Sequence, residues 1–305
     1  MKQSENSLVE TPPTRVSHLT IFDTRTHTTK VIHETSALIE APNWTLDGQD
    51  LIVNGGGHLY RIAVDGIGGL EPVDTGTVGD SNNDHVLSPD GRLIYISSND
   101  GHLYVLPIEG GQPRCVTDAT DGLAARYLHG ISPDGTTLAF IGLEKTEDVV
   151  RFNIYTAPST GGVVTPLTDS IYHHDGSEYS PDGAFMYFNA DIPTTLVPGS
   201  TPMSEHLVTQ LFRMKPDGTD ILQLTFDERV NWFPHLSPDG ITLIYLSYEA
   251  GVRGHPANQT VELRAVASDG SDPRTLVTLT GGQGTINVNS WSPDSTRFAY
   301  VGYGL

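Results

Sequence analysis

The chain has 305 residues and a formal net charge of −20, from 37 acidic residues against 17 lysines and arginines. This balance argues against binding to nucleic acids or anionic membranes, because both depend on basic patches that neutralise phosphate. The single cysteine, Cys115, excludes a disulfide framework. The acidic composition itself indicates only solubility and does not predict a binding partner.

Residues 1–14 are polar and contain Pro12-Pro13, which predicts a flexible tail ahead of one domain over residues 15–305. No apolar run follows the N-terminal charges, so the sequence shows neither a secretory signal nor a membrane anchor. We therefore expect a cytoplasmic protein.

Two strand-like runs follow the tail, at residues 16–22 and 30–33, ahead of the first copy of a recurring turn. At the other end, residues 288–291 and 297–301 give two more strands before the chain stops. We expect the N-terminal pair to complete the last repeat from the outside. That arrangement closes a ring and removes its open sheet edges.

Six copies of a Ser-Pro-Asp-Gly-like turn organise the rest of the chain. Proline sets φ at the second position, aspartate bonds the backbone beyond it, and glycine accepts the left-handed conformation that returns the chain. The turn aspartates are Asp47, Asp90, Asp134, Asp182, Asp239 and Asp294, at spacings of 43, 44, 48, 57 and 55 residues. A period near ~45 residues is typical of β-propellers. We predict an all-β, six-bladed β-propeller with four-stranded antiparallel blades.

Extra chain in the later repeats falls on one face of the predicted disc. Strands alternate in direction within a blade, so the recurring turns all lie on one face and the links from second to third strand lie on the other. The insertions occupy such links, at residues 143–150, 191–206 and 248–259. Loops on a rigid scaffold often carry function, so we expect the site on this second face.

Polar residues gather where the inner strands begin, on that same face. His85 and His129 each stand three residues before the turn serine, in neighbouring repeats. The candidate catalytic residues are His85, His129, Asp84 and Glu178. The candidate ligand-binding residues are Asn43, Asn83, Arg126, Asp175, Trp232, His235, Arg253 and Asn289.

Two interpretations of this cluster stay open at this point. One is a polar pocket, with or without a divalent metal such as Mn, Zn or Fe on His85, His129 and His235. The other is that these groups satisfy one another and a column of channel water. No local spacing such as His-x-x-x-His favours a metal. Aromatic rings beside amides suit a sugar, and Trp232 is the best placed of the three tryptophans.

The sequence lacks the motifs of two other enzyme classes. The chain has no Gly-x-Ser-x-Gly elbow, so the sequence makes no case for a serine hydrolase. Residues 281–284, Gly-Gly-Gln-Gly, are not a phosphate loop, because no Lys-Ser or Lys-Thr follows and an inner strand comes next.

The repeats resemble those of the TolB-type propeller, above all at residues 179–188 and 236–245, over nearly the whole chain from about residue 15. The resemblance implies the propeller fold. It leaves the activity open, because similar repeats occur in the TolB translocation protein, in prolyl oligopeptidases and in oligogalacturonate lyase. The resemblance does not extend to the signal peptide and α/β domain of TolB or to the peptidase domain of prolyl oligopeptidases, and we expect no counterpart of them here. The metal-binding His and Gln residues of oligogalacturonate lyase have no residue-by-residue match in this sequence, so no metal-ligand role is assigned here from that family.

The leading hypothesis is a cytoplasmic TolB-like propeller that binds a small carbohydrate-like ligand at the His-rich mouth of its channel. Whether it also acts on that ligand is open. As an enzyme it would be a lyase or hydrolase of a sugar or uronate, with or without a metal, using His85 or His129 as general base. Asp84, Asp175 or Glu178 would orient the base or hold the metal. The alternative is a protein-interaction scaffold of the TolB kind with no catalysis.

Overall fold

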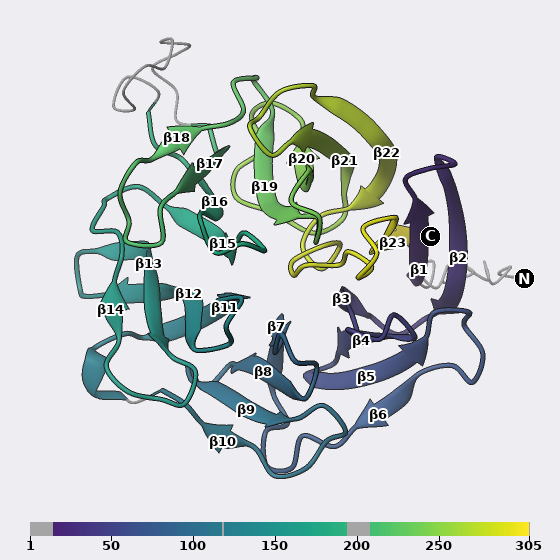
Figure 1. Cartoon of the computed structure of the whole chain (residues 1–305), viewed down its shortest axis with the longest axis horizontal. Coiled ribbons are helices and arrows are strands. Elements are labelled where there is room, and N and C mark those ends of the chain that lie inside the picture. Colours follow the sequence, from purple (N-terminus) through teal and green to yellow (C-terminus); the bar gives the residue numbers. More distant parts are fainter. Residues whose placement is uncertain (1–14, 118, 194–207, 305) are drawn as a thin grey trace, which may run out of the picture.

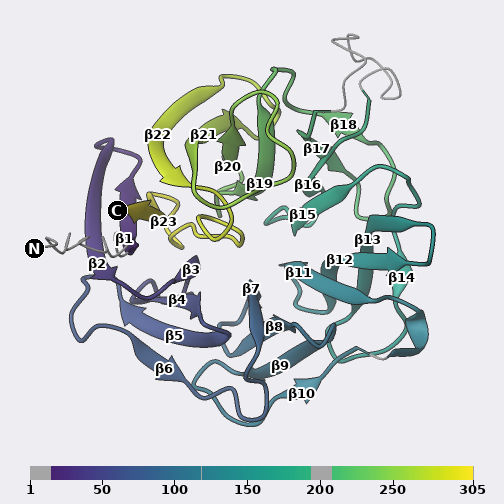
Figure 2. The ribbon, with the colours of Figure 1, turned by 180° about the vertical axis from the view of Figure 1, so that it is seen from behind.

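The structure is a computed structural model that describes residues 15–117, 119–193 and 208–304. The predicted tail, residues 1–14, and most of the predicted insertion at 191–206 lie outside the described residues. Six sheets follow one another around a common axis, as seen from either face of the disc (Figure 1, Figure 2). The predicted all-β, six-bladed propeller is confirmed. Among the described residues, no helix is long and apolar enough to span a bilayer.

Five blades are four-stranded antiparallel sheets in which sequence order and spatial order agree. The first holds β3 (Glu40–Trp44), β4 (Asp50–Gly55), β5 (His58–Ala63) and β6 (Glu71–Val73). The second holds β7 (Ser81–Leu87), β8 (Leu93–Ser98), β9 (Leu103–Pro107) and β10 (Arg114–Cys115). The third, after the 3-10 helix η1 (Ala119–Asp121), holds β11 (Ala125–Ile131), β12 (Thr137–Lys145), β13 (Val150–Pro158) and β14 (Thr165–Pro166). The fourth holds β15 (His174–Tyr179), β16 (Met186–Ala190), β17 (Gln210–Met214) and β18 (Leu222–Gln223). The fifth holds β19 (Val230–Leu236), β20 (Thr242–Tyr248), β21 (Gln259–Ala267) and β22 (Arg274–Gly281).

The last blade joins the two ends of the chain. β1 (Val16–Asp23) pairs with β23 (Arg297–Gly304) on one side and with β2 (Thr28–Thr35) on the other. The predicted closure of the ring by the N-terminal strands is therefore confirmed. The predicted inner strand at 288–291 is reduced to one bridge, between Trp291 and Phe298. The Asn289 side chain replaces part of the ladder, because its Oδ1 accepts a hydrogen bond from Trp291 N at 3.1 Å.

The recurring turn is built as its sequence predicts. In the second blade, Ser88 Oγ donates to Asp90 Oδ1 at 2.6 Å and accepts from Leu93 N at 2.9 Å, while Gly91 N donates to Ser88 O at 2.8 Å. Gly91 has a φ of 69°, and Ser295 of the sixth copy adopts a φ of 60°. Each turn thereby fixes the register of one inner hairpin.

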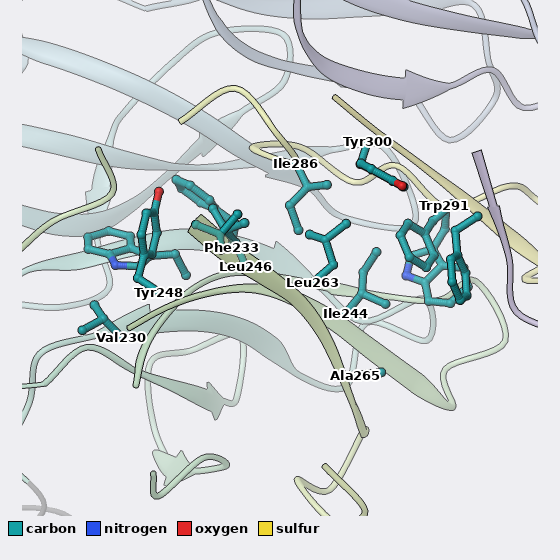
Figure 3. Close-up of a cluster of buried hydrophobic side chains, with 14 residues drawn as sticks. Val230, Phe233, Ile244, Leu246, Tyr248, Leu263, Ala265, Ile286, Trp291 and Tyr300 are labelled. Atoms are coloured by element: carbon teal, nitrogen blue, oxygen red, sulfur yellow. The ribbon is translucent and has the colours of Figure 1, made fainter. Parts of the chain in front are cut away.

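Neighbouring blades pack through their apolar faces. One buried cluster joins Ile244, Leu246 and Leu263 of the fifth blade to Trp291 and Tyr300 of the last (Figure 3). Burial of each Leu or Ile side chain contributes about 1.5–3 kcal/mol. Such clusters between successive blades hold the inner strands rigidly around the axis.

The inner strands are irregular. All five that form a ladder contain a shift in register, between Ser81 and His85 in β7 and between Leu128 and Gly130 in β11. Such bulges turn side chains away from the regular alternation. In β19 the bulge includes Phe233, which has a φ of 55° and whose N–H donates to Asn189 Oδ1 at 2.9 Å.

Candidate functional site

A cavity of about 260 Å³ lies where the inner strands begin. The second, third, fourth and fifth blades and two loops contribute to its wall. The lining residues are Asn82, Asn83, Asp84, Tyr127, His129, Phe152, His173, Asp175, Phe233, His255, Gln283 and Asn287. Of the predicted site residues, the structure brings Asp84, Asn83, His129 and Asp175 together here.

His129 is held between two hydrogen-bond acceptors. Its Nε2 lies 2.9 Å from Asp175 Oδ1, and its Nδ1 lies 3.3 Å from the backbone oxygen of Asn287. Burial alone lowers the pKa of His129, but the charge of Asp84 and the hydrogen bond to Asp175 outweigh burial and raise this pKa to about 9. At neutral pH the ring is an imidazolium with both N–H groups engaged. This geometry does not suit His129 to the general-base role that we predicted for it.

Asp175 is the counter-charge of this imidazolium. Burial raises the pKa of its carboxyl, but the hydrogen bond and charge of His129, with His173 and His255 nearby, hold the pKa well below its usual range. Gly176 N also donates to Asp175 Oδ1 at 2.8 Å. Asp175 is therefore an ionised group that fixes its neighbours.

Asp84 is the carboxyl of the cavity that remains partly unpaired. Asn82 Nδ2 donates to Asp84 Oδ2 at 3.2 Å, and Asp84 N donates to Asn82 Oδ1 at 2.8 Å. The other oxygen, Oδ1, is buried and accepts no hydrogen bond from the described residues. Burial is the main cause that raises the pKa of Asp84, to about 7, against the lowering effect of the His129 charge. This carboxyl changes charge in the neutral range.

Aromatic rings also line the cavity. The His173 ring stacks on Phe152 with centroids 4.3 Å apart, and Phe233 stacks on His129 at 5.9 Å. His173 Nε2 is buried, 3.7 Å from Asp175 Oδ2, and makes no hydrogen bond within the described part of the chain. His255 contacts Gln283 through Nδ1, and burial lowers its pKa. The wall thus combines flat apolar faces with a buried nitrogen open to a ligand.

Trp232 packs against two of the lining rings without lining the cavity itself. It is 2% exposed and does not line the cavity, and its ring meets those of His173 at 5.5 Å and His255 at 4.5 Å edge to face. The ligand contact that we predicted for Trp232 is therefore indirect in this structure.

A second polar group lies further along the inner strands, nearer the turns. Glu178 Oε2 is 2.8 Å from His235 Nδ1, and Glu178 Oε1 accepts from Asn289 Nδ2 at 2.5 Å. His235 Nε2 is 2.5 Å from the backbone oxygen of Ile286. Glu178, His235 and Asn289 satisfy one another, as the second sequence interpretation expected, and they do not line the cavity.

Four other predicted residues lie away from the cavity. Arg126 is buried, forms an ion pair with Asp121 and donates to Gly101 O at 2.7 Å, so its guanidinium connects the second blade to the segment before the third. Arg253 is exposed, and Asn43 donates to the backbone of His85 at 3.4 Å. His85 itself is fully buried and pairs with Ile96 in the regular ladder.

The bulges explain why His85 and His129 separate despite their equal spacing from the turn. In β11 the register shift leaves His129 without a cross-strand partner in the described ladder, so it points into the cavity. In β7 the shift comes earlier, so Asp84 takes the bulged place and His85 returns to the ladder. A shift of one residue turns a side chain to the opposite face of a strand.

The predicted metal-ligand set is not assembled. Among residues 15–117, 119–193 and 208–304, no group of three His, Cys, Asp or Glu side chains is placed to hold a metal ion. Both ring nitrogens of His129 and of His235 are engaged by protein acceptors, and His85 lies outside the cavity. These residues do not fit a divalent metal.

Eight of the twelve lining residues were not selected from the sequence, among them Phe152 and Gln283. Phe152 reaches the cavity because β12 and β13 have nine residues each and extend beyond most strands of the other blades. Gln283 lies in the Gly-Gly-Gln-Gly run, whose Gly282 and Gly284 have φ of 117° and 91°. Its place directly before the sixth inner segment was the signal that could have revealed it.

No family model matches the chain. It is 39% identical over 291 residues to the uncharacterized protein Atu1656 of Agrobacterium fabrum (strain C58), covering 94% of this chain and 92% of that protein. A solved Agrobacterium tumefaciens structure, named provisionally as a TolB, superposes with a TM-score of 0.84 at 38% identity, over 95% of this chain and 99% of the other.

Two more distant structures share the fold alone. An oligogalacturonate lyase in complex with manganese gives a TM-score of 0.55 at 16% identity, over 85% of this chain and 72% of the other. A gluconolactonase from Xanthomonas campestris gives 0.60 at 14% identity, over 94% of both chains. With its close relative, its blade count and its repeats in agreement, the chain belongs to the family of TolB-like six-bladed β-propellers.

Proposed function

We propose that this propeller binds a small carbohydrate-like ligand in the cavity where its inner strands begin. One observation carries the proposal: the wall of one cavity combines aromatic rings with buried polar atoms that have no hydrogen-bond partner among the described residues. A concave site with a few convergent polar groups is the usual form of a small-molecule site.

The unpaired atoms favour a ligand with hydroxyl groups. Asp84 Oδ1 and His173 Nε2 are buried and make no hydrogen bond to any residue that the structure describes. An unsatisfied buried polar atom costs about 1–3 kcal/mol, which a ligand hydroxyl at hydrogen-bond distance would recover. The rings of Phe152, Phe233 and Tyr127 offer apolar faces for the C–H face of a sugar ring.

The charge balance favours a neutral ligand. Asp175 and His129 form a close pair of opposite charge, so neither supplies a free charge for the ligand. Proteins of the same fold support the sugar class, since the lyase and the lactonase are named for sugar-derived compounds.

The surface gives less support to a protein-docking platform. The exposed large aliphatic side chains of the described residues lie in loops and outer strands of different blades and do not line the cavity; those in loops include Leu46, Ile67, Val163, Ile171 and Ile241. A docking surface usually presents a contiguous apolar patch.

Calorimetric titration with a panel of neutral monosaccharides, uronates and sugar lactones tests the proposal. We expect binding to the wild type and roughly tenfold weaker binding to Phe152→Ala, which removes the stacking face. Phe185→Ala is the matched control, since Phe185 packs under Arg213 beside a turn of the opposite face. Absence of binding by any member of the panel, or equal loss in both variants, would reject the proposal.

A further inference from the structure

We propose that Asp84 is the proton-transferring residue of this cavity, and that the cavity hydrolyses the internal ester of a sugar lactone. The inference rests on the proposed binding of a carbohydrate-like ligand and adds a reaction and a catalytic residue to it. It also exchanges the roles expected from the sequence, in which a histidine was the base and Asp84 its support.

The geometry of Asp84 carries the first step. Asn82 Nδ2 donates to Asp84 Oδ2, and Asp84 N donates to Asn82 Oδ1, so the Asp84 carboxyl is fixed. The buried Oδ1 of Asp84 has no partner among the described residues, and Asp84 lines the cavity. The carboxylates of Asp175 and Glu178 are both engaged by a histidine. Asp84 is therefore the carboxyl placed to exchange a proton with a bound molecule.

The groups around Asp84 suit that task. The imidazolium of His129 on β11 lowers the pKa of Asp84, while Asp175 on β15 and Glu40 on β3 raise it, and burial is the largest cause. The resulting pKa of about 7 lets the carboxylate take up a proton and release it again at neutral pH. His129 cannot replace it, because both of its ring nitrogens already face acceptors.

The number of available carboxyls points to an ester and not to a glycoside. Most glycoside hydrolases use two carboxyl groups on opposite sides of the scissile bond. Of the two aspartates in the cavity wall, Asp175 is committed to His129, which leaves Asp84. Ester hydrolysis needs one general base and donors for the carbonyl oxygen. Two lining residues can donate, His173 through its buried and unpaired Nε2 and Tyr127 through its hydroxyl.

The step balances with water as the only co-reactant. Asp84 takes a proton from water as the water oxygen bonds to the lactone carbonyl carbon, whose oxygen gains negative charge beside His173 and Tyr127. The bond from that carbon to the ring oxygen then breaks. The ring oxygen receives the proton from Asp84, and the product is the open-chain hydroxy acid.

Two measurements on the full chain test the inference. One is the rate of hydrolysis of D-glucono-1,5-lactone above the spontaneous rate, followed with a pH indicator between pH 5.5 and 8.5. The other is calorimetric binding of 1,5-anhydro-D-glucitol, which has the ring but no carbonyl. Asp84→Asn is the test variant. Asp90→Asn is the control, because Asp90 lies in an exposed turn outside the cavity.

We expect Asp84→Asn still to bind the glucitol, with an affinity lowered by no more than about tenfold because one hydroxyl contact changes. Its kcat/KM for the lactone should fall by on the order of 100-fold, with Asp90→Asn unchanged. The wild-type kcat/KM should rise with pH through about 7, as Asp84 ionises. If the glucitol binds but the lactone is not hydrolysed above the spontaneous rate, or Asp84→Asn is as active as the wild type, the inference fails and the binding proposal stands. If neither compound engages the protein, both are rejected for this ligand class.

Discussion

Replacing Asp84 by asparagine should stabilise the fold at neutral and alkaline pH. The pKa of Asp84 is about 7 in the folded chain against an ordinary value of 3.8, mainly because of burial. The folded state therefore holds this proton more tightly than the unfolded state. The resulting stabilisation is complete below pH 3.8 and is lost as the pH rises to about 7. The two pKa values differ by about three, which corresponds to about 4 kcal/mol of unfolding free energy.

The asparagine of the Asp84→Asn variant would keep the size of the side chain without the charge, while Asp175 still pairs with His129. We expect the unfolding free energy of Asp84→Asn to exceed that of the wild type by up to about 4 kcal/mol at pH 8. The two proteins should have nearly equal stability near pH 4. Urea denaturation followed by tryptophan fluorescence at pH 4, 6 and 8 measures the difference.

The control variant should change stability in the opposite direction. Hydrogen bonds from Ser88 and from Arg92 N lower the pKa of Asp90 in the folded state. The Asp90 carboxylate therefore stabilises the fold above the pKa that Asp90 has in the unfolded chain, and this stabilisation is lost in acid. Asp90→Asn should accordingly destabilise the protein at pH 8. A pH-independent difference between Asp84→Asn and the wild type, or a destabilised Asp84→Asn at pH 8, would refute the electrostatic argument.

Three other substitutions separate the cavity from the scaffold. Asp175→Asn should lower the free energy of unfolding by about 3–5 kcal/mol near pH 7, because it leaves the buried imidazolium of His129 without its counter-charge. In urea denaturation, adding His129→Gln to Asp175→Asn should reduce this loss of unfolding free energy. An undiminished loss in the double variant would contradict the pairing. Glu178→Gln should cost about 1–3 kcal/mol by disturbing the contacts to His235 and Asn289, while calorimetry finds ligand binding in the cavity unchanged. Ser132→Ala should cost about 1 kcal/mol in thermal unfolding, because the hydroxyl donates to Asp134 and accepts from Thr137 N; no loss of stability would show that the backbone alone holds the turn.

The fold was predictable because its signals are local and repeated. Each turn carries its own hydrogen bonds, such as Ser180 to Asp182, and needs no distant residue to form. Six such turns at similar spacing leave few architectures other than a ring. The closure by β1 and β2 followed from counting strands at both ends, and the pairing of Val16–Asp23 with β23 confirms it.

The site was predicted in place and only partly in its members. The sequence put His85 and His129 in equivalent positions, but the place of the register shift in β7 and in β11 decides which of them reaches the cavity. Nothing in the local sequence fixes where a bulge falls, because it depends on how each strand meets its neighbours. Protonation was equally out of reach, since the pKa of His129 depends on Asp84 and Asp175 from other blades.

The polar groups around the axis divide into two sets with different consequences. Glu178, His235 and Asn289 complete one another's hydrogen bonds, which is how a buried network stabilises a fold. Asp84 Oδ1 and His173 Nε2 remain unpaired within the described residues, and Phe233 in the same cavity wall holds a φ of 55° that bulky residues avoid. Each of these features lowers stability, and packing alone requires none of them. Their coincidence in one cavity is the physical reason to place the function there and the structural role in the network nearer the turns.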